Sequence, residues 1–152
     1  MENWTRGLSL IALTIMIHAT GIAFMILVLH SIRDRMQRAV APRHVLAILI
    51  SLIGAAGLLL AVLHGIEAAI WAAIYWWLSA LRSPGEALLY SVDSITTRGA
   101  AGLMLEQPWR MMGALEAADG MLLFGISTAF IFGVMQAYLP LVITNHHRHL
   151  NR

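Results

Sequence analysis

The residues whose types could do chemistry gather near the middle of the chain, in a short run of small and polar residues that contains an arginine. The run consists of Thr96, Thr97, Arg98, Gly99, Ala100, Ala101 and Gly102. Its glycines disfavour a continuing helix, so we expect irregular, extended backbone. Within a membrane, such backbone is tolerated only where protein buries it or where it lines a water-filled path. The run therefore favours a loop that is buried in protein or lines a water-filled path.

A short helix is predicted directly before this run. Ser83 is its expected N-cap, Pro84 takes the first helical position, and Glu86 completes an S-x-x-E capping box. The helix, residues 84–96, is too short to span a bilayer, which takes roughly 20 residues. Long apolar stretches lie on both sides of it. A short capped helix followed by an irregular segment between two long apolar helices indicates a re-entrant pore loop.

Ionisable residues within the apolar stretches are further candidates, because an intramembrane charge is costly unless it is paired or hydrated. Arg98 is expected to pair with Asp93, which lies about a turn and a half earlier on the short helix. Glu67 is a second candidate partner for Arg98, although it can also bond to His64 on the same face of its helix. Asp93 and Glu67 are thus predicted to support the loop.

The composition places most of the chain in a membrane. The chain has 152 residues, of which 59% are hydrophobic, and a soluble domain of this size would not be so apolar. There is room for about three spans but not for an additional soluble domain. The formal net charge is +2 and the basic residues lie near the ends of the apolar stretches, which indicates membrane topology rather than nucleic-acid binding. The absence of cysteine excludes disulfides and cysteine nucleophiles.

Three spanning helices account for the order of apolar and basic segments. Residues 1–44 comprise a first span and a basic loop, residues 45–81 an outer helix, and residues 108–144 an inner helix, which a basic tail, 145–152, follows. Both basic clusters then lie in the cytoplasm, with the N-terminus outside and the pore loop open to the outside. The outer helix is long enough to tilt, bend or project from the membrane. A break near His64, which would add a fourth span, is the alternative.

The segment from Ala87 to Ala129 resembles the pore module of the potassium-channel superfamily. It reads ALLYSVDSITTRGAAG, then Trp109-Arg110, then LEAADGMLLFGISTA. Small bacterial proteins labelled two-pore-domain potassium channel family proteins read roughly A-L-Y-F-S-x-x-T-x-T-T-L-G-Y-G-D, then W-R and L-E-A-x-N-G-L-L-L-F-G-x-S-T-A, with the same spacing. The resemblance extends more weakly back to His64 and so covers a little over half of the chain.

This resemblance implies an all-α membrane protein with three transmembrane helices, and with a re-entrant pore helix (84–96) and a filter loop (97–102) between the second and third. It also implies a homotetramer around a central pore, because one loop supplies a quarter of the ring of carbonyls that replaces an ion's hydration shell. The expected location is the cell membrane, in a bacterium the inner membrane. Expected partners are further copies of the chain, lipid and other channel subunits, without nucleic acid. No cofactor or metal is expected besides permeant monovalent ions.

The departures from the family pattern fall on the filter itself. Thr97 and Gly99 match the T-x-G of the family. Arg98 stands where the family has Val or Leu, and Ala100 stands where it has the bracing Tyr. Ala101 replaces the second Gly, and Gly102 replaces the Asp. We therefore predict a wider, shortened or collapsed filter without potassium selectivity. Arg98 is expected to point away from the pore. In the rival arrangement, four copies of Arg98 face the axis and form a positive ring that admits anions.

Three residues of the inner helix match functional positions of the family. Glu116 and Asp119 lie at i, i+3 and share one face of the helix. Glu116 is also Glu in the family and is expected to support the pore helix from behind. Asp119 replaces an Asn and is expected to line the cavity and attract cations. Gly120 falls at the hinge glycine of the superfamily, and close helix packing is its alternative role.

The sequence therefore predicts a potassium-channel-like, tetrameric ion channel that is weakly selective or non-selective among monovalent cations. The alternatives are an anion pore formed by a ring of Arg98 and a non-conducting or regulatory channel-like subunit. A haem- or quinone-binding electron carrier using His18, His30 and His64 is disfavoured, because His18 and His30 lie about 120° apart around one helix. No enzyme motif is present, so no catalytic residue is assigned.

Overall fold

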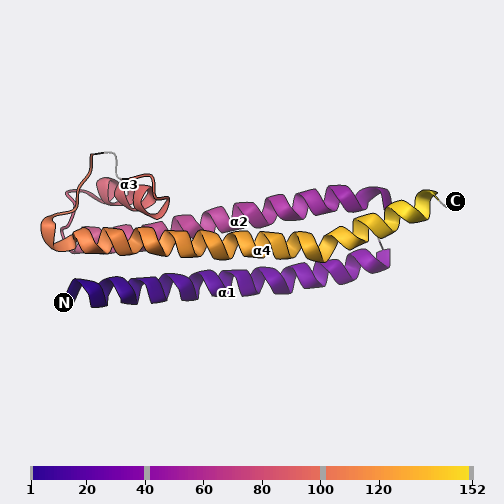
Figure 1. The fold of residues 1–152 in the computed structure, drawn as a ribbon, viewed down its shortest axis with the longest axis horizontal. Helices are drawn as coiled ribbons and strands as arrows, with labels where there is room; N and C mark the ends of the chain where they lie inside the picture. The colour runs from indigo at the N-terminus through magenta and orange to yellow at the C-terminus, as the bar shows by residue number, and fades with distance from the viewer. Residues whose placement is uncertain (1, 40–41, 100–101, 151–152) are drawn as a thin grey trace. The chain divides into compact units, whose positions relative to one another are not determined.

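The computed structural model describes residues 2–39, 42–99 and 102–150. Its elements are α1 (Glu2–Ala39), α2 (Pro42–Trp77), α3 (Pro84–Ile95), the 3-10 turn η1 (Gln107–Trp109) and α4 (Arg110–Leu150) (Figure 1). No strand occurs in the described residues. The predicted filter residues Ala100 and Ala101 lie outside them.

Three helices are long and apolar enough to cross a membrane. The segments that meet this criterion, by length and composition, are Asn3–Arg33, Ala47–Trp77 and Gln107–Pro140. Most side chains of these segments are not buried within the chain, so their apolar surface is available to lipid. With 12 residues, α3 is too short to span. The prediction of an all-helical fold with three long apolar helices and one short helix is confirmed at this level.

The outer helix is continuous but shorter than predicted. α2 runs without interruption from Pro42 to Trp77, so the alternative of a break near His64 is wrong. It ends at Trp77 rather than at residue 81 because a Schellman motif closes it. The N–H groups of Ser79 and Ala80 bond back to carbonyls of the last helical turn, at 3.0 and 2.9 Å. Ser79 has φ 54°, a left-handed conformation that glycine usually supplies.

The other helix ends also differ from the predicted boundaries. α1 continues to Ala39, and α2 begins at Pro42 because proline suits the first turn of a helix. The loop between the two helices is therefore shorter than predicted, since it was expected to extend to residue 44. The inner helix does not end at residue 144. α4 continues through Pro140 to Leu150, because no glycine or second proline follows Pro140 within it, and the described part of the predicted tail is helical.

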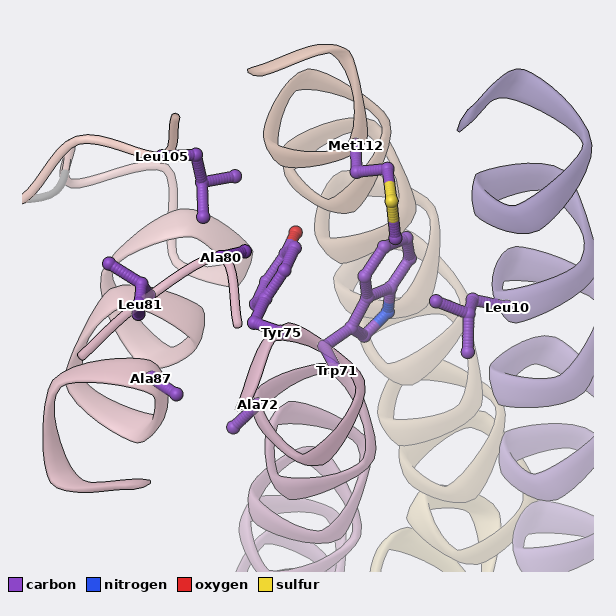
Figure 2. Packing of buried hydrophobic residues seen from close by; sticks show 9 residues of the cluster. All are labelled: Leu10, Trp71, Ala72, Tyr75, Ala80, Leu81, Ala87, Leu105 and Met112. Carbon is purple, nitrogen blue, oxygen red and sulfur yellow. The ribbon is translucent and has the colours of Figure 1, made fainter. Parts of the chain in front are cut away.

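The chain divides into two compact units. Unit 1 comprises Met1–Thr20 and Val62–Ile126 and contains the whole of α3. The centre of its apolar core is formed by the fully buried Trp71 and Tyr75 of α2. Figure 2 shows these aromatic side chains with the other members of the cluster, Leu10, Ala72, Ala80, Leu81, Ala87, Leu105 and Met112. Residues from α1, α2, α3 and α4 therefore share one core.

Unit 2 comprises Gly21–Ala61 and Ser127–Arg152. Its core is a second apolar cluster, to which α1, α2 and α4 contribute Ile22, Met25, Leu49, Ala56, Leu60, Phe130, Val134 and Tyr138. The Tyr138 hydroxyl donates a hydrogen bond to the Leu29 carbonyl, which joins α4 to α1 within this unit. Unit 2 contains no part of α3 or of the predicted filter.

Candidate functional site

The start of α3 is fixed by side-chain caps. Ser83 has extended backbone, with φ −143° and ψ 156°, and its Oγ accepts a hydrogen bond from the Glu86 N–H at 3.1 Å. Glu86 Oε2 accepts in turn from the Arg82 N–H at 3.2 Å, one residue before the usual partner in a capping box. The predicted N-cap is therefore confirmed. With Pro84 at the first helical position, these bonds fix where α3 begins.

The end of α3 and the start of the predicted filter form a tight turn. The N–H groups of Thr97 and Arg98 bond back to carbonyls of the last helical turn, both at 2.9 Å, in a second Schellman motif. Thr97 has φ 57°, and Gly99 and Gly102 have φ 79° and 90°. The prediction of extended backbone is wrong at Thr97, because this residue closes the helix. A β-branched residue in the left-handed region is strained, by about 1–3 kcal/mol.

The predicted ion pair between Asp93 and Arg98 is confirmed. Arg98 Nη2 lies 2.7 Å from Asp93 Oδ1. The Arg98 side chain is 65% exposed, whereas that of Asp93 is 3% exposed. Asp93 Oδ2 is buried and has no hydrogen-bond partner among the described residues. The arginine therefore partly neutralises a buried carboxyl group and holds the start of the predicted filter to α3.

Glu116 is fully buried and joins three helices. Its Oε2 accepts a hydrogen bond from the Tyr75 hydroxyl of α2 at 2.8 Å. Its Oε1 lies within hydrogen-bond distance of the Ser91 hydroxyl of α3, which also lies 2.7 Å from the Ala68 carbonyl of α2. Glu116 thus connects α4 with α2 and α3, which is the supporting role predicted for it.

Asp119 is also fully buried, which contradicts the prediction that it lines a cavity. Its Oδ2 accepts hydrogen bonds from the Thr14 hydroxyl of α1 at 2.7 Å and from the Trp71 indole of α2 at 3.1 Å. A side chain that faced a central pore would be exposed on a single chain. The two donors and the surrounding side chains instead enclose Asp119, where it joins α1, α2 and α4.

Gly120 allows α4 to approach the C-terminal end of α3. A methyl group at Gly120 would overlap the backbone carbonyl of Ile95, the last residue of α3. Ser94 Oγ donates a hydrogen bond to the Gly113 carbonyl at 3.0 Å. This bond is a second contact that holds α3 against α4. α4 stays helical through both glycines. Of the two roles considered for Gly120, the structure favours close packing over bending.

Glu67 contacts two histidines rather than Arg98. His18 Nδ1 of α1 lies 2.8 Å from Glu67 Oε1, and His64 Nδ1 lies 3.2 Å from Glu67 Oε2. The three side chains are buried, and the His64 ring stacks on Phe124 with 4.2 Å between ring centroids. His64 and Glu67 are therefore neighbours as predicted, but the predicted hydrogen bond is not made between Nδ1 and Oε2. The prediction that Glu67 partners Arg98 is wrong, because Asp93 already holds Arg98 and the histidines occupy Glu67.

Sequence reasoning missed the contribution of α1 to this region. Thr14 and His18 contact Asp119 and Glu67, and no local pattern links α1 to residues so far along the chain. One signal could have found them. Thr14 and His18 are polar residues four positions apart in an apolar helix, so they share one face. Polar side chains at membrane depth usually contact other helices.

Comparison with known proteins gives no family assignment. No protein-family model, curated protein or solved structure matches the chain. The resemblance of the segment 87–129 to the potassium-channel superfamily therefore stays a prediction.

Proposed function

We propose that the chain is the pore-forming subunit of a tetrameric, potassium-channel-like ion channel of the cell membrane, in which an altered filter passes monovalent cations with little selectivity. The observation that carries the proposal is the geometry of α3. This helix of 12 residues is capped at both ends, bonded to α2 and α4, and followed by left-handed residues. A helix so short cannot span a bilayer. In a membrane it would form a re-entrant pore helix, with the N-terminus of the chain outside and the C-terminus in the cytoplasm.

Charge at the end of α3 supports cations as the permeant ions. The C-terminal end of a helix carries a partial negative charge, which favours a cation beside it. Arg98 is the only basic residue of the segment 96–102, and its pairing with Asp93 offsets its charge. Ala100 and Ala101 stand where a narrow potassium filter has Tyr and Gly. The proposed pathway is accordingly wider than such a filter and does not separate potassium from sodium.

A second candidate function, an anion pore, rests on the exposure of Arg98. Its side chain is 65% exposed on the single chain. In a tetramer, four such groups around one axis would attract anions and repel cations. The cation channel and the anion pore therefore differ in the position of the Arg98 guanidinium group. It pairs with Asp93 in the cation channel and faces the pore axis in the anion pore.

Ion flux from reconstituted liposomes tests the proposal. Purified tetramer is placed in vesicles under opposed potassium, sodium and chloride gradients. The cation channel predicts potassium and sodium flux at similar rates without chloride flux, and the anion pore predicts chloride flux that Arg98→Leu abolishes. Arg82→Leu, an exposed arginine before α3, is the matched control and should leave flux unchanged. Absence of all flux from protein shown to be tetrameric would contradict both candidates and favour a regulatory subunit.

A further inference from the structure

A cluster of two histidines and one glutamate lies inside unit 1, and the proposed ion pathway does not use it. It consists of His18 from α1 and His64 and Glu67 from α2. His18 and Glu67 are fully buried and His64 is nearly so. One ligand atom from each side chain lies within 4.8 Å of the other two. These side chains are brought together by two different helices, so their proximity is a property of the fold.

One of the two carboxyl oxygens of Glu67 lacks a hydrogen-bond partner among the described residues. A buried carboxylate is costly unless it is paired and hydrogen-bonded. Oε1 lies 2.8 Å from His18 Nδ1, within hydrogen-bond distance. Oε2 is buried and receives no hydrogen bond from the described residues, although His64 Nδ1 is 3.2 Å away. A cation held between the carboxylate and the imidazoles would satisfy this oxygen and compensate the charge.

We propose that His18, His64 and Glu67 bind one divalent transition-metal ion of the zinc class. Imidazole nitrogens and a carboxylate oxygen form a common ligand set of zinc, whereas calcium and magnesium prefer oxygen ligands alone. Zinc–ligand bonds of about 2.0–2.2 Å place neighbouring ligand atoms about 3.3–3.6 Å apart around a tetrahedral ion. The separations of 2.8 Å from His18 Nδ1 to Glu67 Oε1 and of 3.2 Å from His64 Nδ1 to Glu67 Oε2 would therefore have to widen to admit the ion.

The neighbours of the cluster hold one of the ligands in place. The His64 ring stacks on Phe124 of α4, with an angle of 24° between the rings. Its centroid lies 5.0 Å from that of His18, so the two imidazoles are already adjacent. An ion bound here would link α1 to α2 within unit 1. This role is independent of conduction, so the metal proposal stands whether or not the chain forms a channel.

Zinc binding to the full chain tests this proposal. The tail histidines His146, His147 and His149 are first replaced by alanine, because they could bind zinc themselves, and any affinity tag is removed. After treatment with a chelator, the detergent-purified protein is titrated with zinc by calorimetry. We expect about one zinc ion per chain, and His18→Gln or Glu67→Gln should weaken binding at least about tenfold. His30→Gln, an exposed histidine of the same helix as His18, should leave binding unchanged.

Cobalt spectroscopy tests the same site without a substitution in the cluster, so it gives a result even where a variant fails to fold. Cobalt bound to the unsubstituted cluster should give the visible absorption of a tetrahedral site with nitrogen and oxygen ligands, and added zinc should remove it. Magnesium in excess should not compete. A folded, tail-substituted chain that binds neither zinc nor cobalt would overturn the proposal and leave a hydrogen-bonded cluster only. Equally, zinc binding that His18→Gln and Glu67→Gln leave unchanged would show that the ion sits elsewhere.

Discussion

Units 1 and 2 are built from the same three long helices but bury different kinds of side chain. In unit 2, the buried residues that carry polar side-chain groups are few among those whose burial the structure describes: Ser127 and, through its hydroxyl, Tyr138. In unit 1, the buried polar and charged side chains come from all four helices and comprise Thr14, His18, His64, Glu67, Ser91, Asp93, Ser94, Glu116 and Asp119. Unit 2 therefore resembles an ordinary apolar helix contact, whereas unit 1 is organised by directional bonds.

The difference shows how a short helix can be held beside three helices that are long and apolar enough to span a membrane. In lipid, apolar packing alone discriminates weakly between helix arrangements, because the surrounding chains are as apolar as the side chains. Hydrogen bonds from Ser91 and Ser94 fix α3 against α2 and α4. Unit 2 has no short element to position and can rely on apolar contacts. The polar contacts of Ser91 and Ser94 are thus best explained by the need to place α3 and the segment after it.

The largest contrast between the units is expected at Glu116. Glu116→Ala leaves the buried Tyr75 hydroxyl without its acceptor, at a cost of about 1–3 kcal/mol. It also removes one of the two acceptors of the Ser91 hydroxyl, which keeps the Ala68 carbonyl. We expect a large fall in the thermal unfolding temperature in detergent, measured by circular dichroism. Ser127→Ala in unit 2 should cost no more than about 1.5 kcal/mol, the usual net value of one hydrogen bond. Equal losses in the two variants would remove the distinction between the units.

Glycines of α4 give the next test. Gly120→Ala should destabilise by about 1–3 kcal/mol, because the added methyl group overlaps the rigid Ile95 carbonyl and must displace a helix. Gly133→Ala on the same helix is the matched control from unit 2, since a methyl group there meets nothing within 4 Å. It should be neutral or slightly stabilising. Unfolding temperatures of the two variants measure the contrast, and a tolerated Gly120→Ala would argue against close packing of α3 on α4.

The strained turn after α3 predicts a gain in stability. Thr97→Gly removes a β-branched residue from φ 57° and should stabilise the fold by about 1 kcal/mol. Thr96→Gly is the control, because Thr96 has φ −84° and its hydroxyl donates to the Val92 carbonyl at 2.7 Å. That variant should lose stability. Chemical denaturation of both proteins decides the point, and the reverse order would mean that Thr97 is not strained.

The smallest expected effect is the coupling between Asp93 and Arg98. Because the arginine is 65% exposed, solvent weakens the pair, and we expect a coupling energy of no more than about 1 kcal/mol. A double-mutant cycle with Asp93→Asn and Arg98→Leu measures it from unfolding free energies. Zero coupling would show that the two side chains do not interact in solution, which would favour the arrangement with Arg98 in the pore.

Local sequence patterns predicted the parts of unit 1 that depend on neighbours along the chain. Ser83, Pro84 and Glu86 identify the start of α3, because capping is a local interaction. Asp93 and Arg98 lie close enough in sequence for their pairing to be expected. The left-handed conformations of Ser79 and Thr97 were not predicted, because glycine normally occupies such positions. Both residues adopt them where a Schellman motif closes a helix.

Contacts between distant helices were the part that the sequence could not predict. Asp119 was expected to face a cavity. The sequence pattern around an intramembrane acid is the same whether the acid binds ions or bonds to other side chains. Its donors, Thr14 and Trp71, lie on two other helices. The same holds for His18, which meets Glu67 only once α1 and α2 pack together. Such pairings depend on the rotation of each helix about its axis, which local spacing does not determine.

Cysteine accessibility tests the central claim, that the segment after α3 lines a water-filled path, most directly. The chain contains no cysteine, so Thr97→Cys, at an exposed position of this segment, introduces a single thiol. We expect a charged, membrane-impermeant thiol reagent to modify this cysteine in liposomes and to reduce cation flux. Leu27→Cys, 70% exposed on the candidate span of α1, should stay unmodified because lipid covers it. If Thr97→Cys conducts cations but does not react, or reacts without any change in flux, the segment does not line the ion path.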